Sequence, residues 1–170
     1  MHIETTSYAE DVHDDFVYIS NPFGDLVTIT GAVEAKIIMA TAPVVFTGRI
    51  DAEHVEANSI GFVYRKPGNV HATCLAGGRL VHICRAIVDA ETIISEAIVV
   101  DGGLVEVERM HTERLILDRG SAIRARKIFA NSIEIRAASI IRANQLEAGS
   151  IVGHAVDTGE LIIRDYVNLS

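Results

Sequence analysis

The sequence has only two cysteines, Cys74 and Cys84, together with three prolines and no tryptophan in 170 residues. The two cysteines form neither a CxxC pair nor the framework of bridges that holds small secreted domains together. Aromatic residues make up only 5% of the chain, whereas 49% is hydrophobic, with Val, Ile and Ala recurring throughout. This composition excludes a disulfide-rich scaffold and favours short β-branched strands over a bundle of helices.

Two further absences bear on the surroundings of the protein. No apolar run approaches the roughly 18 residues of a membrane span. Residues 1–20 carry five carboxylates, where a signal peptide would need basic residues followed by an apolar core. We therefore expect a cytoplasmic protein that is not inserted in a membrane and is membrane-associated only through partners. The formal net charge of −8 argues against a nucleic-acid partner, because such proteins usually carry a basic surface.

Motifs of common catalytic sites are also missing. The chain contains no GxSxG, HExxH or phosphate-binding glycine loop. His54 and Cys74 occupy equivalent positions of adjacent repeats, but two ligands fall short of the three or four that zinc requires. We therefore expect no catalytic residue, no cofactor, no metal and no enzymatic activity.

What the sequence does contain is an internal repeat. The apolar pattern that starts at Ile123 fits again, without a gap, from Ile141. Traced back along the chain, the pattern starts at positions 16, 33, 50, 70, 88, 105, 123 and 141, a period of 17 or 18 residues with one repeat of 20. Each repeat holds three apolar pairs whose members lie two residues apart. Because that spacing is typical of strands, each repeat is expected to be one coil with three short strands and corners between them.

The six apolar columns of this alignment contain no Asp, Glu, Lys or Arg, although 22% of the chain is charged. The pattern predicts an all-β, single-domain parallel β-helix, a three-sided β-solenoid of about eight coils. A helical repeat of the same period fits poorly with the β-branched residues of Ile133–Ile141. We assign residues 16–158 to the solenoid, 1–15 to an acidic segment that is flexible or folds back on it, and 159–170 to a C-terminal capping strand and tail.

The third strand of the first coils is expected to be apolar on its outer side as well. A strand that is apolar on both faces needs a cover. The cover is another copy or a partner protein, or else the N-terminal segment or C-terminal tail folded back; a membrane surface is disfavoured by the acidic charges nearby. The candidate lateral interface consists of the hydrophobic residues assigned to this outer side, Val27, Ile29, Val44, Phe46, Val63, Val81 and Ile83.

The two ends of such a stack would carry unpaired backbone groups that must be capped or joined to another chain. Apolar residues occur near both ends and are candidates for end-to-end contacts or for caps: Phe16, Tyr18 and Phe23 near the first coil, and Leu161, Ile163 and Tyr166 after the last. Charge is also segregated along the first outward face, which is acidic as far as Glu108 and basic from Arg124.

The pattern Ile-x-Ala-x-x-Ile-x-Ile at Ile128–Ile135, followed by Ser139, Ile141 and Ala143, resembles the bactofilin family of polymer-forming cytoskeletal proteins. The resemblance covers roughly Phe16 to Val156. It implies a right-handed triangular β-helix that assembles end to end into filaments or scaffolds without a nucleotide, often near a membrane. Unlike many bactofilins, this chain uses Ala rather than Gly in the small columns.

We therefore expect a structural, self-assembling scaffold or cytoskeletal protein that forms homo-oligomers or filaments, with another structural protein as a further partner. One alternative is an adaptor that does not polymerise and binds a different protein through the apolar face. The other is a trimeric enzyme of the hexapeptide-repeat type, whose strict period of six does not match the corners of this repeat.

Overall fold

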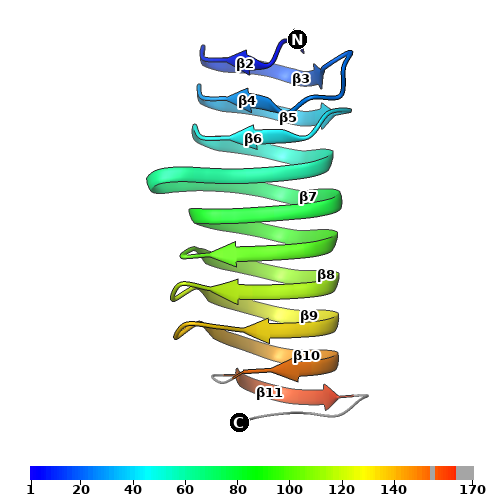
Figure 1. Ribbon diagram of the computed structural model, residues 1–170, viewed down its shortest axis with the longest axis vertical. Coiled ribbons are helices and arrows are strands. Elements are labelled where there is room, and N and C mark those ends of the chain that lie inside the picture. The colour runs from blue at the N-terminus through cyan, green and yellow to red at the C-terminus, as the bar shows by residue number, and fades with distance from the viewer. Residues whose placement is uncertain (154–155, 164–170) are drawn as a thin grey trace.

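The computed structural model describes residues 1–153 and 156–163. Within these ranges the chain forms β-strands and no helix. The strands form one 11-stranded sheet in which neighbouring strands pair in parallel. Figure 1 shows the chain winding from end to end as a stack of coils, which makes the protein a β-solenoid of about nine turns. The strands are β1 (His2–Glu4), β2 (Ser7–Tyr8), β3 (Val12–Ser20), β4 (Val27–Ile29), β5 (Val33–Ala40), β6 (Val44–Phe46), β7 (Ile50–Asp101), β8 (Leu104–Asp118), β9 (Ala122–Ile135), β10 (Ile140–Val152) and β11 (Val156–Ile163).

Each coil has three sides, which we call the first, second and third walls. In the coil that begins at Ile50, they are formed by residues 50–53, 54–57 and 60–63. β5 pairs with the first two walls of this coil, from Val33↔Ile50 to Ala40↔Ala57, and β6 pairs with its third wall. The 52-residue strand β7 contains three successive coils without an interruption.

The core consists of side chains stacked from coil to coil. Ile123 pairs with Ile141 and Ile128 with Leu146, and all four side chains are 0% exposed. Complete burial of one such aliphatic side chain contributes on the order of 2 kcal/mol. The backbone hydrogen bonds run along the axis, so each coil is held mainly by its two neighbours.

The winding begins earlier than the sequence analysis placed it. β1 pairs with Tyr18–Ser20 and β2 pairs with Thr28–Ile29, so residues 1–15 are part of the solenoid and do not fold back along its side. The first full coil starts at Val12, which pairs with Val33. The long corner between Ser20 and Val27 conceals this start, because no other coil has a corner of that length at this place.

The winding also continues at the other end. β11 pairs with β10 from Ile141↔Val156 to Ala148↔Ile163, in the same parallel register as the preceding coils. The boundary at residue 159 was therefore wrong, because β11 is one continuous strand across it. Tyr166 lies outside the described residues.

A corner of variable length changes the register of the third wall. Three steps separate Ala57 from the inward residue Ile60, but four separate Ala40 from Val44, and four separate Gly77 from Val81. One additional residue turns every following side chain of a strand to the opposite face.

The insertion in the 20-residue coil forms a loop that projects beyond the neighbouring coils (Figure 1). Tyr64 fixes this loop: its side chain is buried, and its hydroxyl donates a hydrogen bond to the carbonyl oxygen of Gly48 at 2.7 Å. A Cβ at Gly68 would lie 2.0 Å from the Tyr64 ring, so only glycine fits there without displacing the ring. Burial raises the pKa of Tyr64 to about 12.

The register of the third wall can be tested in the coil that begins at Val70. Val81 is 0% exposed, whereas the neighbouring Leu80 is half-buried on the outside. We expect Val81→Asp to lower the free energy of unfolding by about 3 kcal/mol or more, because it leaves an unpaired charge in the core. Leu80→Asp should cost less than about 1 kcal/mol. Denaturant unfolding followed by circular dichroism measures both, and the reverse order of stability would refute the register.

Tyr64 gives the solenoid a defined alkaline sensitivity. The unfolded phenol has a pKa of about 10, so the folded state retains this proton more tightly. The contribution of Tyr64 to stability should be independent of pH below pH 10 and should decline as the pH rises from 10 through about 12. Tyr64→Phe should cost about 1 kcal/mol at pH 7, through the lost hydrogen bond, and should show a smaller alkaline decline. Thermal melts across this pH range measure the effect, with Tyr18→Phe as the control that keeps the wild-type decline.

Candidate functional site

The candidate lateral interface on the third wall is largely absent from the surface. Six of its seven residues point into the core and are 0–1% exposed: Val27, Ile29, Val44, Phe46, Val81 and Ile83. Phe46 and Phe62 stack within the core, with ring centroids 5.8 Å apart. Only Val63 is half-buried on the outside. The prediction was wrong because it assigned these strands one residue out of register.

The outer side of the third wall is nevertheless poor in charge. Once the register is corrected, its central positions hold Val45, His82, Val99 and Ile116, all of them half-buried in the single chain. The row becomes charged only at Glu134, which accepts a hydrogen bond from Arg136 at 2.7 Å. The third wall therefore offers a shallow aliphatic strip in place of the deep apolar face that was expected.

A more exposed apolar patch, which the sequence pattern did not predict, lies on the second wall. Phe16 pairs with Ile37 and Tyr18 pairs with Met39, so these four side chains form two adjacent outward rows. Phe16, Ile37 and Met39 are 42%, 38% and 37% exposed, which is high for large apolar side chains. We call these four residues the second-wall patch.

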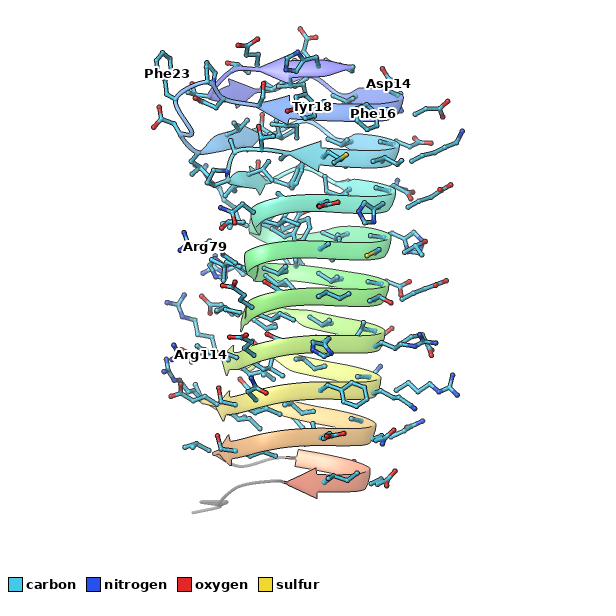
Figure 2. The ribbon with its side chains drawn as sticks, turned by 90° about the vertical axis from the view of Figure 1, so that its right-hand side faces the viewer. Asp14, Phe16, Tyr18, Phe23, Arg79 and Arg114 are labelled. Carbon is cyan, nitrogen blue, oxygen red and sulfur yellow. The ribbon has the colours of Figure 1, made fainter. Side chains whose placement is uncertain are left out.

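The repeat that was started at position 16 made Phe16 an inward residue, and Tyr18 and Phe23 followed it in the inward columns of the first coil; the structure corrects this assignment. Figure 2 shows Phe16 and Tyr18 on the outer surface of the first coil and Phe23 on a projecting loop. The inward positions belong to Val17 and Ile19, which are 0% exposed, while Phe23 is 85% exposed. The sequence signal for this register was the alternation of Val17 and Ile19 with the aromatic residues Phe16 and Tyr18, which places the two aliphatic residues on one face of the strand and the two aromatic residues on the other.

The apolar character of the second wall returns in later coils. Ile94 is 47% exposed and pairs with His111, whose ring lies 6.2 Å from that of Phe129. A shallow cleft of about 410 Å³ is lined in part by these two rings and Asn131. Glu56, which accepts a hydrogen bond from His54 at 3.2 Å, separates this region from the second-wall patch.

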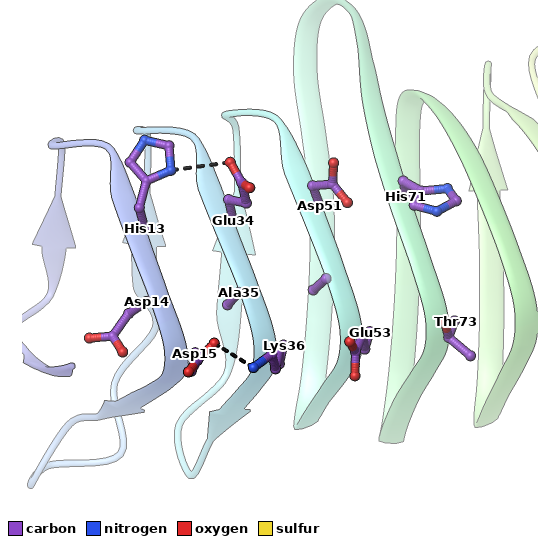
Figure 3. Close-up of a pocket in the computed structure, with 11 residues that line it drawn as sticks. His13, Asp14, Asp15, Glu34, Ala35, Lys36, Asp51, Glu53, His71 and Thr73 are labelled. Atoms are coloured by element: carbon purple, nitrogen blue, oxygen red, sulfur yellow. Dashed lines mark hydrogen bonds and ion pairs between the residues drawn. The ribbon is translucent and has the colours of Figure 1, made fainter.

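The first wall carries rows of charged side chains. An open cleft of about 530 Å³ runs along its N-terminal half, and Figure 3 shows the side chains that line it. Within it, His13 lies 3.2 Å from Glu34, and Lys36 lies 2.8 Å from Asp15. The hydrogen bond from Lys36 to Asp15 raises the pKa of the lysine.

The change of sign along this wall agrees with the sequence pattern. Three basic residues of the C-terminal half each form an ion pair with an acidic residue of an adjacent coil. Because all the partners are well exposed, each pair contributes less than about 1 kcal/mol. The pairs are Arg124 with Glu106 at 2.8 Å, Arg126 with Glu108 at 3.7 Å and Arg142 with Asp157 at 3.8 Å.

The N-terminal end of the stack is polar at its centre. Asp14 occupies the column that holds Ala35 in the next coil, and its carboxylate accepts a hydrogen bond from the Met1 ammonium at 2.8 Å. This hydrogen bond lowers the pKa of Asp14. No described strand pairs with the outer edge of residues 12–15.

At the opposite end, the backbone of β11 forms the last described strand. Leu161 pairs with Leu146 and Ile163 pairs with Ala148, which places both residues in register with inward residues of the preceding coil. On the same strand, Ile162 is 38% exposed.

The two positions considered for a metal do not converge. His54 interacts with Glu56, while burial, and then the charge of Glu56, raises the pKa of the Cys74 thiol. Across residues 1–153 and 156–163, no group of three or more His, Cys, Asp or Glu side chains could hold a metal ion. The same residues include no helix that is long and apolar enough to cross a membrane.

Comparison with models of protein families, with curated proteins and with solved structures found no match for this chain.

Proposed function

We propose that this protein is a structural, self-assembling scaffold whose copies join end to end through their coils and side by side through the second-wall patch. The single observation that carries the proposal is the open strand edge at the start of a regular parallel stack. Strand edges with unpaired N–H and C=O groups are templates for pairing with another chain. In this proposal the protein acts in the cytoplasm, assembles without a nucleotide and approaches a membrane only through partners.

The open edge has a definite hydrogen-bonding pattern. The N–H of Val12 donates to the carbonyl oxygen of Ala32 in the next coil at 2.8 Å. Because successive residues of a strand direct their backbone groups to opposite edges, the N–H and C=O of His13 face away from the stack. A strand from a second copy could continue the ladder at His13.

The second-wall patch supplies the apolar surface that end contacts lack. The Met1 ammonium and the Asp14 carboxylate at the end would resist complete loss of water. Phe16, Ile37 and Met39 lie beside this end on an outer wall, where their exposed area can be buried without removing a charge from water. Lateral contact can therefore stabilise an assembly whose end contacts are mainly backbone hydrogen bonds.

The same patch favours a second candidate function, an adaptor that remains monomeric and binds a different protein. Electron microscopy and sedimentation of the purified chain distinguish the two. Filaments, sheets or oligomers whose size grows with protein concentration support the scaffold. A monomer at all concentrations up to the millimolar range rules out the scaffold and leaves the adaptor.

End-to-end contact can be tested at His13 with two substitutions. His13→Pro removes the N–H from the open edge and places a ring against an incoming strand, so we expect it to shorten or abolish polymers. His13→Ala removes the same side chain but keeps the N–H, and should polymerise like the wild type. Polymer length by electron microscopy is the measurement, and circular dichroism confirms that both variants fold. Equal polymers from both variants would exclude this edge as a contact.

Lateral contact can be tested with a charge in the patch. Ile37→Glu should reduce side-by-side association by about tenfold or more, because its carboxylate would have to be buried in the contact. Thr92→Glu places the same charge in the same outward column, away from the patch, and should leave association unchanged. Light scattering at equal concentrations compares the two, and an equal effect of both would argue against the patch.

A further inference from the structure

A cleft of about 780 Å³ lies on the third wall where the projecting loop leaves the solenoid. Thr30, Thr47, Val63 and Cys84 line it and are outward residues of four successive coils. The loop adds Tyr64 and the side chains that follow it. The cleft spans several coils and is bordered by the loop, which projects beyond the neighbouring coils (Figure 1).

Three cations converge on this cleft: Arg65, Lys66 and Arg85. In the part of the chain that the structure describes, none of them takes part in a side-chain hydrogen bond or ion pair. The contrast with Arg119 is informative, because that residue occupies the equivalent corner two coils further on and pairs with Asp101 at 3.2 Å. Three positive charges without a carboxylate partner are unexpected in a chain with a net charge of −8.

Arg85 lies at a tight backbone corner. Its φ is +54°, in the left-handed region that disfavours residues with a side chain. The comparable corner of the next coil uses Gly102, with φ +68°, which adopts this conformation without strain. A non-glycine residue in this conformation destabilises the folded backbone. Arg119 adopts the same conformation, with φ +53°, at the equivalent corner outside the cleft, so the strain is a property of the corner, and Arg85 differs from Arg119 in lying beside the cleft without a carboxylate partner.

We propose that this cleft binds a small organic anion, in which a phosphate or carboxylate group is attached to an apolar body. Arginine donates paired hydrogen bonds to such planar or tetrahedral oxyanions, and Lys66 adds a point charge. The hydroxyl of Thr47 is a further donor on the floor. Val63 and the Tyr64 ring give one side of the cleft an apolar lining, and its volume lies in the range of small-molecule sites.

Isothermal titration calorimetry of the full chain tests the proposal with three probes. Phenyl phosphate carries both features of the ligand, inorganic phosphate carries only the charge, and benzyl alcohol carries only the apolar body. We expect phenyl phosphate to bind most tightly, inorganic phosphate more weakly and benzyl alcohol not at all, with binding of the anions weakened by added salt. Absence of phenyl phosphate binding at millimolar concentration would overturn the proposal.

Matched substitutions locate the site. Arg85→Asn keeps a residue that tolerates a positive φ, so the corner remains intact, and we expect it to weaken phenyl phosphate binding by about tenfold or more. Arg119→Asn makes the same change at the same kind of corner, away from the cleft, and should bind like the wild type. Lys66→Gln should give a smaller loss than Arg85→Asn. Equal effects of the two arginine substitutions would refute the assignment.

A vesicle-binding experiment distinguishes binding of a soluble ligand from binding of a lipid headgroup. Flotation with phosphatidylglycerol vesicles should leave the protein unbound, because the cations lie within a cleft on a wall and do not form a flat basic surface. Binding to vesicles that is lost in Arg85→Asn, without binding of phenyl phosphate, would replace the soluble ligand by a membrane surface and so contradict the proposal.

Discussion

The structure depends on the one-to-one stacking of residues from coil to coil. Axial hydrogen bonds hold each strand in register with the next, and this register places Ile123 over Ile141 and Ile128 over Leu146. Once it is set, the alternation of each strand determines which side chains enter the core and which form the outer walls. The same constraint makes the fold sensitive to corner length, since one additional residue exchanges the two sets over an entire wall.

This sensitivity explains what could and could not be predicted from the sequence. In the later coils the corner that precedes the third wall has a constant length, and Ile98, Val100, Leu115 and Leu117 are buried as the repeat predicted. The third wall failed at Val44–Val45–Phe46 and at Leu80–Val81–His82–Ile83, where apolar residues stand on both sides of the strand. Because both registers place apolar residues in the core there, hydrophobicity does not distinguish them. The additional residue in the corner before the third wall was therefore not recognised. The second-wall patch was missed for the same reason, because the first coil had been aligned from Phe16 instead of Val12.

The three walls acquire different properties because stacking repeats each outward position along the axis. The first wall accumulates charge, as in the pair of Lys36 with Asp15 and the pair of Arg124 with Glu106. The second wall collects Phe16, Ile37 and Met39 into one apolar patch, although the stacked residues Phe16 and Ile37 are 21 residues apart in sequence. The third wall carries the projecting loop that Tyr64 anchors. The walls therefore differ from one another because their outward columns hold different residue types. A single wall varies along its length because the corners between strands differ in length.

Charge on the first wall bears on the direction of any lateral assembly. Its exposed carboxylates lie mainly toward the N-terminal end and its arginines from Arg124 onward, so each copy is a rod of opposite charge at its two ends. Two parallel rods at the same height would bring like charges together, whereas antiparallel or staggered rods bring Glu34 or Asp51 toward Arg124. Such exposed charges act over only about 8 Å at physiological ionic strength. Apolar contact would therefore supply most of the affinity of the proposed assembly, while the charges would select its direction, and high salt would weaken that selection before it dissolved the assembly.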